Sequence, residues 1–324
     1  PGAMGRRGRS PQAPLSPEET ALLDAFCSAR LLSPRTRKKY ASIYRSFKAV
    51  VKKPIWEAGR EDVRKWFRAV VSEWRAGTLH SDARKLRALY RFALTWKFAI
   101  PEAEARIRAD EVFSVIPWRR LAERERKEVD LRDEVLTPEE VERLLSAAEH
   151  PRLKALIAVA IETGARPGEL LSLRLRDVEM GPKFTVLRLR GKTGERAVPV
   201  IRSLPYLKAW LDVHPARDDL DAPLFAERRY GQVKSITLSA FSKSLRELAR
   251  KAGIRKRIRP YSLRHTRMTD LARVLTEQEL KLVAGWTKDS KMARRYVHLS
   301  GRDVDNKIIE IYGLKKREEK KLQK

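Results

Sequence analysis

The chain has 324 residues, more than a single domain usually contains, so we expect two domains of roughly 100 to 200 residues each. It contains 71 lysines and arginines against 42 aspartates and glutamates, and the formal net charge of +29 favours nucleic acid as a partner over an anionic membrane surface. No run approaches the roughly 18 apolar residues of a spanning helix and no signal peptide is recognisable, so we expect a soluble, cytoplasmic, DNA-associated protein with no membrane partner.

Cysteine and histidine usage argues against a metal centre. One cysteine, Cys27, and five scattered histidines are present, which predicts neither a disulfide framework nor a zinc site. We therefore expect no metal and no cofactor. Residues 1–5 resemble the remnant of an expression tag, and residues 1–17, rich in Pro, Gly, Arg and Ser, are predicted to form a disordered tail.

Residues 18–117 are predicted to be helical throughout. Apolar side chains recur there every three or four residues, in stripes at residues 40–51, 63–74 and 86–93, which is the spacing of amphipathic helices. About four helices predict a small all-α domain. Three outward-facing cations near the start of the first stripe can lie against phosphates, or can equally form an ordinary solvated face: Arg35, Lys38 and Lys39.

The segment from 118 to 134 has few apolar residues and alternating charges, as in an exposed linker or a solvent-bridging helix. We expect the domain boundary there and a second domain at residues 135–300. That domain opens with a capping box, Thr137-Pro138-Glu139-Glu140, which starts a helix. A later helix is predicted to stop at Gly164, so that Arg166 lies just beyond a helix end.

Alternating residues at 184–190 and 196–201 predict two strands of a hairpin, with Lys192 at the turn between them. Helical spacing returns after Ser203, and no βαβ alternation or internal repeat follows. The expected fold class is therefore mainly α with a small β-hairpin or antiparallel sheet.

Four motifs, in this order, carry a family resemblance. They are TGARPGELLSLRLRDV with Arg166, the hairpin lysine Lys192, RPYSLRHTRMTDLA with Arg264, and AGWTKDSKMARRYVHLSGRDVDN with Trp286 and Tyr296. Over about residues 134 to 312 the chain resembles the tyrosine recombinases of the phage integrase family, and most closely archaeal integrases. The resemblance implies an all-α core-binding domain that contacts DNA, a mixed α/β catalytic domain, and site-specific recombination or integration of DNA, as in mobile elements.

The resemblance also implies roles for these residues. Tyr296 would attack a phosphodiester and leave a 3′-phosphotyrosyl bond and a free 5′ hydroxyl, without metal or ATP. Arg166 and Arg264 would clamp the scissile phosphate, because a guanidinium stays charged and bonds two oxygens at once. Lys192 would give a proton to the departing 5′ oxygen, and Glu169 would orient Arg166. The alternatives are a paired arginine, a plain surface lysine and a tyrosine that only packs.

Two departures from the family pattern affect the acid/base assignment. Tyr261 stands where many members carry a histidine, and because a phenol is a poor proton acceptor we expect it to position the phosphate. His265 occupies the family's second, usually structural, histidine position. Trp286 lies ten residues before Tyr296, one more than is common, and is expected to use its indole N–H on the phosphate or to pack against it.

The remaining features concern DNA and assembly. Cations before Arg264 are expected to track the DNA backbone: Arg250, Lys251, Arg255, Lys256 and Arg257. Residues 301–324 are predicted to form a short helix and a basic tail, and since such a helix can dock on a neighbouring subunit in relatives, we expect a homo-oligomer on DNA, a tetramer that passes through a Holliday junction. Two alternatives stay open: a type IB topoisomerase-like nicking and closing enzyme, and a non-catalytic DNA-binding remnant.

Overall fold

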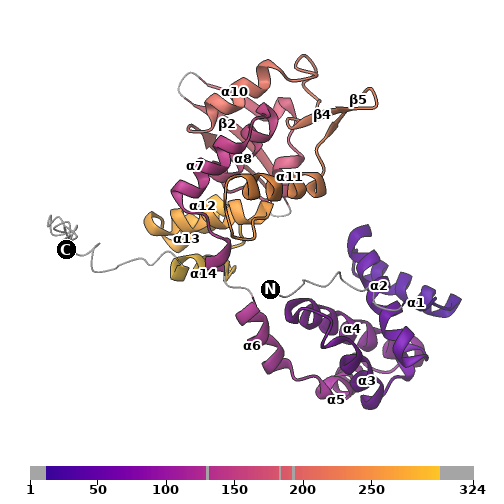
Figure 1. Cartoon of the computed structure of the whole chain (residues 1–324). Helices are drawn as coiled ribbons and strands as arrows, with labels where there is room; N and C mark the ends of the chain where they lie inside the picture. Colours follow the sequence, from indigo (N-terminus) through magenta and orange to yellow (C-terminus); the bar gives the residue numbers. More distant parts are fainter. Residues whose placement is uncertain (1–11, 129–130, 182–183, 192–193, 300–324) are drawn as a thin grey trace, which may run out of the picture. The chain divides into compact units, whose positions relative to one another are not determined.

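The computed structural model describes residues 12–128, 131–181, 184–191 and 194–299. The chain divides into two compact units, Pro1–Asp130 and Leu131–Lys324, each of which is described here by itself (Figure 1). The division falls within the segment 118–134, for which the sequence predicts a boundary. The bounds predicted for the two domains remain a prediction.

The described part of the first unit is helical. Its α-helices are α1 (Pro17–Ala29), α2 (Pro34–Val51), α3 (Arg60–Val70), α4 (Ala76–Phe98), α5 (Glu102–Val112) and α6 (Trp118–Glu128), with short 3-10 turns at Ile55–Glu57 and Phe113–Val115. Helices α1 and α2 begin where the side chains of Ser16 and Ser33 accept hydrogen bonds from backbone N–H groups in the first turn, with proline next in the chain.

Aromatic residues make up much of the core of the first unit. The rings of Phe47 and Trp66 lie 6.0 Å apart, and both side chains are fully buried. A buried carboxylate joins α1 to α2: Glu19 accepts a hydrogen bond from the Tyr44 hydroxyl at 2.8 Å and forms an ion pair with Lys48. Because its charge is paired and hydrogen-bonded, Glu19 can stay in this interior.

One helix is shorter than its apolar spacing suggests. The sequence predicts a helix through Trp74, but α3 ends at Val70 and a turn follows. Val71 and Trp74 still pack against the core of the unit. The apolar pattern correctly predicted that these side chains pack on the core, but it wrongly predicted that their backbone is helical. A turn that packs on a core carries apolar side chains just as a helix does, so the pattern does not distinguish the two.

The segment predicted as a linker begins with a helix that belongs to the first unit. In α6 the side chain of Leu121 is buried in that unit's apolar core, and Glu125 lies 2.8 Å from the Nδ1 atom of His80 on α4. The helix therefore packs along α4.

The second unit combines helices with two small antiparallel sheets. Its α-helices are α7 (Pro138–Ala147), α8 (Pro151–Thr163), α9 (Pro167–Leu171), α10 (Leu204–Asp212), α11 (Leu238–Lys251), α12 (Pro260–Val274), α13 (Glu277–Ala284) and α14 (Met292–Leu299), with 3-10 turns at Leu131–Glu134 and Leu175–Asp177. The predicted capping box is confirmed at α7, where Thr137 and Glu140 bond each other's backbone N–H groups. Helix α8 ends, as predicted, at Gly164.

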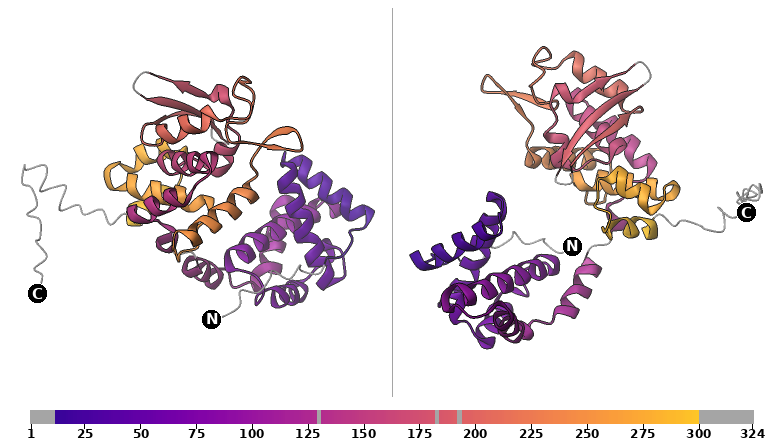
Figure 2. Two further views of the ribbon diagram at one scale, coloured as in Figure 1. Left: turned by 45° about the horizontal axis from the view of Figure 1, so that its top comes forward. Right: turned by 180° about the vertical axis from the view of Figure 1, so that it is seen from behind.

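The larger sheet has the strand order β1 (Val178–Met180), β2 (Thr185–Gly191) and β3 (Gly194–Val200). The predicted hairpin is β2–β3, paired so that Leu187 lies opposite Val198. Strand β1 and a second hairpin, β4 (Ala226–Arg229) with β5 (Gln232–Ser235), were not predicted, because three- and four-residue strands are too short to show alternation. The β4–β5 hairpin projects from its unit (Figures 1 and 2). The expected fold class is confirmed.

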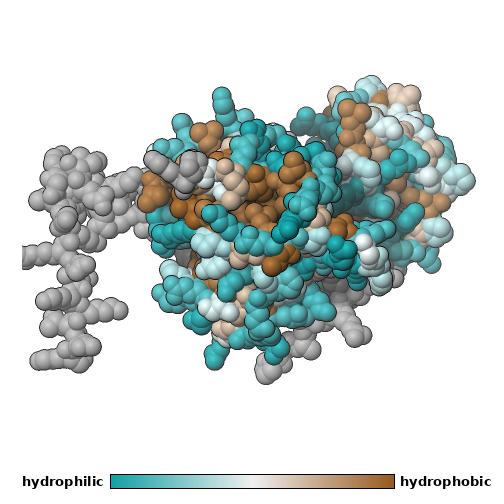
Figure 3. Space-filling view, turned by 90° about the horizontal axis from the view of Figure 1, so that it is seen from above, coloured by the Kyte–Doolittle hydropathy of each residue, from teal (hydrophilic) through white to brown (hydrophobic). Residues whose placement is uncertain are grey.

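Apolar side chains of α8, α10, α11 and the three-stranded sheet share one core, which includes Leu156, Trp210 and Phe241. The surface visible in Figure 3 is mostly hydrophilic, with smaller hydrophobic areas among the polar residues. Within the part of the chain that the structure describes, no helix has the length and apolar character needed to cross a bilayer.

Gly164 provides a test of how tightly the end of α8 is packed. Its φ is +59°, and a Cβ atom there would lie 2.4 Å from Cε of Met268. We expect Gly164→Ala to lower the free energy of unfolding by about 3 kcal/mol, from left-handed strain and overpacking together, as measured by urea denaturation.

Gly253 supplies the matched control. Its φ is +66°, but no atom lies within 4 Å of the added Cβ, so Gly253→Ala should cost only the strain, about 1 kcal/mol. Equal losses in the two variants would show that packing against Met268 contributes nothing.

Candidate active site

Two helix ends hold the guanidinium of Arg264. This arginine lies on α12, is 3% exposed, and donates from Nη1 to the Gly164 carbonyl and from Nη2 to the Ala284 carbonyl, both at 2.8 Å. These carbonyls belong to the last turns of α8 and α13, where unpaired C=O groups carry partial negative charge. Burial, followed by the nearby charge of Arg166, lowers the Arg264 pKa to about 10, so the side chain remains a cation at neutral pH.

Arg166 lies beside this pair of helix ends. It precedes α9 and donates from Nη2 to the Gly285 carbonyl at 2.8 Å, one residue beyond the acceptor of Arg264. Its Nη1 lies 2.6 Å from Oε1 of Glu169, so the predicted contact between the two side chains is present. The end of α13 therefore brings the two arginines together from segments about 100 residues apart.

One residue of this cluster, Arg196, is not predicted from the sequence. From β3 it donates to Oε2 of Glu169 at 2.7 Å, so that one carboxylate serves two arginines. Burial alone would raise the Glu169 pKa, but hydrogen bonds from Arg196 and from Arg166 outweigh it and keep the pKa below its usual range. A signal was available: Arg196 shares a strand face with buried Val198 and Val200, where a charge needs a partner.

Tyr296, on α14, lies next to two aromatic rings from other segments, those of Trp286 and His265. Its ring stacks on Trp286 with centroids 5.4 Å apart and planes at 15°, and its centroid is 5.9 Å from that of the His265 ring. The side chain is 1% exposed. Arg264 completes the group, with Cζ 5.3 Å from the centroid of the Trp286 ring, a cation–π distance.

The hydroxyl of Tyr296 lies 2.7 Å from Nδ1 of His265. Burial raises the Tyr296 pKa above its usual range, although Arg264 and Arg295 act in the opposite direction. These cations favour the phenolate, but the desolvation of the buried ring outweighs them. At neutral pH Tyr296 is a phenol.

Two further residues predicted for the site are Tyr261 and Lys192. Tyr261 is 48% exposed on the first turn of α12, with its ring 6.4 Å from that of His265. Lys192 lies outside the described residues, but its neighbour Gly191 is packed against the Glu169 carboxylate so closely that a Cβ would lie 2.4 Å from Oε1. Among the described residues, no cluster of three or more His, Cys, Asp or Glu side chains is arranged to hold a metal ion.

Most of the cations predicted to contact DNA are exposed. On α2 these are Arg35, Lys38 and Lys39; at the end of α11 and in the following loop they are Arg250, Lys251, Arg255 and Arg257. Lys256 differs: it is half-buried and donates to the Val135 carbonyl at 2.8 Å and to Glu140 at 2.7 Å. Its ammonium group is engaged within the unit.

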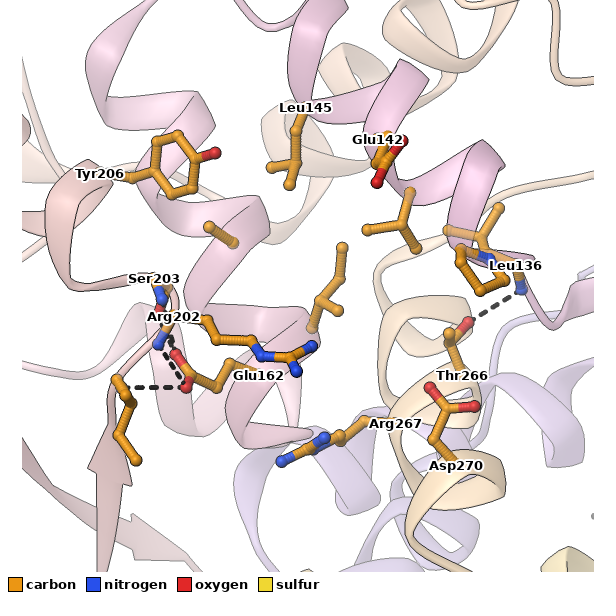
Figure 4. A pocket seen from close by; sticks show the side chains of 15 residues that line it. Leu136, Glu142, Leu145, Glu162, Arg202, Ser203, Tyr206, Thr266, Arg267 and Asp270 are labelled. Atoms are coloured by element: carbon orange, nitrogen blue, oxygen red, sulfur yellow. Dashed lines mark hydrogen bonds between the residues drawn. The ribbon is translucent and has the colours of Figure 1, made fainter. Parts of the chain in front are cut away.

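A separate groove lies elsewhere on the second unit, between α7, α8, α12 and the start of α10 (Figure 4). Its volume is about 550 Å³, and its lining combines apolar side chains such as Leu145 with charged ones such as Glu142 and Asp270. On one side of it the Glu162 carboxylate accepts hydrogen bonds from the backbone N–H groups of residues 201–203 and from the Ser203 hydroxyl, which secures the turn between β3 and α10.

Comparison with known proteins identifies the family of this chain. A sequence model described as the phage integrase family matches residues 134–302, more than half of the chain. The chain belongs to the phage integrase family. It is a tyrosine-type site-specific recombinase, and the predicted family is confirmed.

Individual relatives agree with this assignment. The chain is 26% identical over 301 residues to the tyrosine recombinase XerA of Saccharolobus solfataricus, covering 90% of this chain and 93% of the relative. It is also 26% identical over 257 residues to a tyrosine recombinase of Thermosipho africanus, covering 77% and 83% of the two chains. The expected likeness to archaeal members of the family is thus confirmed.

Solved structures share the fold. A lambda integrase dimer bound to a COC′ core site matches with a TM-score of 0.65 at 17% identity, covering 88% of this chain and 78% of that chain. The Tn1549 transposon integrase in complex with circular intermediate DNA also matches with a TM-score of 0.65, at 19% identity, covering 90% and 98%.

The Glu169 carboxylate yields a prediction about stability. Glu169→Gln removes the negative charge that Arg166 and Arg196 share, and we expect the free energy of unfolding at pH 7 to fall by about 3 kcal/mol. Because the Glu169 pKa is lowered in the folded state, its stabilisation is present above the unfolded pKa of about 4.3 and is lost as the pH falls through the folded pKa. The gap between wild type and variant should therefore close in acid, as followed by urea denaturation.

An exposed carboxylate serves as the control. Glu149 lies 3.9 Å from Lys251 and its side chain is 87% exposed, so Glu149→Gln should change the free energy of unfolding by about 0.5 kcal/mol or less. If Glu169→Gln behaves like Glu149→Gln, the buried carboxylate does not hold the two arginines.

Proposed function

We propose that this recombinase cleaves and rejoins duplex DNA through Tyr296, by way of a 3′-phosphotyrosyl intermediate and without metal or ATP. The observation that carries the proposal is the convergence of four residues in a chain of this family. Arg166 directly precedes α9, Arg264 lies on α12, Trp286 in the turn after α13 and Tyr296 on α14. Attack on a phosphodiester builds charge on the phosphate oxygens, and fixed guanidinium groups can stabilise that charge without reorganising.

Arg166 and Arg264 are proposed to bind the scissile phosphate. Each guanidinium has five N–H donors, and hydrogen bonds within the described part of the protein use two of them in Arg264 and two in Arg166, so both keep donors for a phosphate. The bonds to helix-end carbonyls fix the planes of the two groups before DNA arrives. Glu169 is proposed to support Arg166, and Trp286 to orient Tyr296 by stacking.

Lys192 and Tyr261 are proposed to assist the reaction at the scissile phosphate. Lys192 would protonate the 5′ oxygen as it departs, a role supported by the contact of the preceding Gly191 with Glu169. Tyr261, which is half exposed, would donate a hydrogen bond to a phosphate oxygen.

DNA binding is proposed to use both units. The exposed cations Arg35, Lys38 and Lys39 of the first unit, with Arg250, Lys251, Arg255 and Arg257 of the second, can neutralise DNA phosphates. Lys256 is the weakest member of this predicted set, because Glu140 already pairs with it. We infer that the protein works on cytoplasmic DNA, and that residues 18–117 and 135–300 are its core-binding and catalytic domains.

We further propose that four copies assemble on two DNA sites and exchange strands through a Holliday junction. Solved relatives include a lambda integrase tetramer bound to a Holliday junction. The groove of Figure 4 is a suitable acceptor for residues 301–324 of a neighbouring copy, because its apolar side chains complement the isoleucines of that segment. Its charges are mixed, with Arg202 and Arg267 beside Glu142 and Asp270, and the two carboxylates can pair with the basic tail.

The nucleophile can be tested with a nicked suicide substrate that carries the attachment site. The wild-type protein should become covalently attached to DNA, seen as a shifted band on denaturing electrophoresis, whereas Tyr296→Phe should bind the same DNA and give no adduct. Absence of an adduct with the wild type on its cognate site would contradict the catalytic proposal and favour a non-catalytic DNA-binding remnant. Relaxation of supercoiled DNA that carries no second site would instead favour a topoisomerase-like enzyme.

Assembly can be tested by removing residues 302–324. The shortened protein should bind one DNA site as the full chain does and should lose most of its strand exchange between two sites. Ile201→Asp, a change at an exposed residue of the groove, should reproduce this loss, while Val213→Asp, at a residue of similar exposure outside the groove, should not. Recombination that is unchanged by the deletion would refute the docking of this segment.

A further inference from the structure

Cleavage by Tyr296 requires a proton acceptor. The side chain is 1% exposed, and burial raises its pKa above the usual range, so the phenolate is scarce at neutral pH. The hydroxyl must therefore transfer its proton as the oxygen attacks. Solvent is poorly placed to accept that proton, since the side chain is almost completely buried and its ring stacks on Trp286.

Within the described part of the site, one group is positioned to accept the proton. Nδ1 of His265 lies 2.7 Å from the Tyr296 hydroxyl, within the range that general-base catalysis requires. The Glu169 carboxylate, in contrast, is occupied by three donors from Arg166 and Arg196. Tyr261 has only another phenol to offer, and its ring is adjacent to His265.

The surroundings of His265 keep it in the state that a base needs. Burial, and then the charges of Arg264, Arg295 and Arg259, lower its pKa to about 4, so the ring is neutral at pH 7 and has one nitrogen free to accept. Its other close neighbours are the rings of Tyr296 and Tyr261. A phosphate bound beside Arg264 would offset part of the positive charge and raise the His265 pKa when the proton arrives.

We infer that His265, through Nδ1, is the catalytic proton acceptor for Tyr296. The inference rests on the proposed cleavage by Tyr296 and adds the residue that activates it. It departs from the sequence-based expectation, in which His265 is structural and the acid/base position is filled by Tyr261. The imidazole of His265 can accept the proton along its hydrogen bond to Tyr296, whereas the phenol of Tyr261 is a poor proton acceptor.

As the Tyr296 oxygen forms its bond to phosphorus, its proton passes to Nδ1 of His265. The bond from phosphorus to the 5′ oxygen breaks, its electron pair stays on that oxygen, and Lys192 supplies the proton of the new 5′ hydroxyl. Rejoining reverses these transfers: the 5′ hydroxyl attacks, and His265 returns its proton to the departing tyrosine oxygen.

Single-turnover cleavage of the nicked suicide substrate, measured as a function of pH, tests the inference. The wild-type rate should change little between about pH 6 and 8, because His265 is already neutral there. His265→Asn keeps a hydrogen-bonding atom near the position of Nδ1 but cannot take up a proton. Its rate at pH 7 should fall about 100-fold and should rise with pH, as hydroxide takes over the role of the base.

Tyr261→Phe is the matched control. It removes a neighbouring hydroxyl from the same helix, so it should slow cleavage by weakening the hold on the phosphate without making the rate depend on pH. Rates of His265→Asn within about threefold of wild type, with an equally flat pH profile, would overturn the inference. In that outcome the adduct would still form through Tyr296, so the proposed function would stand; loss of the adduct in the wild type would remove both.

A measurement on the unaltered protein covers the case in which His265→Asn fails to fold. Nitrogen-15 NMR of labelled histidine, assigned by substituting the four other histidines in turn, reports which ring nitrogen of His265 carries the hydrogen. The inference requires a neutral ring at pH 7 with hydrogen on Nε2 and Nδ1 accepting. Hydrogen on Nδ1 would overturn it, because that atom would then donate to Tyr296.

Discussion

A guanidinium that is 3% exposed must find acceptors inside the protein, and for Arg264 these are the carbonyls at the ends of α8 and α13. Helix ends leave carbonyls unpaired, and a buried cation satisfies them while its own charge is compensated. The same end of α13 accepts from Arg166 through Gly285. The position of two helix termini therefore determines where positive charge gathers in the site.

This constraint also explains the glycines at the two helix ends. Gly164 and Gly285 both have φ near +60°, which lets each helix terminate while its last carbonyls turn toward the arginines. At Gly285 a Cβ atom would lie 2.8 Å from Nη1 of Arg196, so the close approach of β3 to the end of α13 depends on the missing side chain. The charged cluster therefore depends on the tight backbone turn at Gly285.

Charge balance gives the site its preference for an anion. Arg166, Arg196 and Arg264 carry three positive charges, and Glu169 contributes one negative charge that Arg166 and Arg196 share. A phosphodiester would supply the missing negative charge. Burial, followed by the charges of Arg264, Arg295 and Arg259, keeps His265 neutral, so Arg264, which would bind the phosphate, also helps to keep the proposed proton acceptor available.

The amino-acid sequence determined those features that depend on neighbours along the chain. The capping box at Thr137, the left-handed end of α8 at Gly164 and the β2–β3 hairpin follow from local hydrogen bonding, glycine conformation and alternation, and the order of the four motifs was sufficient to indicate the family. Tertiary structure decided the contacts between distant residues. Arg196 and Glu169 are 27 positions apart, and His265 and Tyr296 are 31 apart. Neither periodicity nor capping carries information about such pairs, because they depend on how the sheet and α14 pack against the end of α13 and against α12.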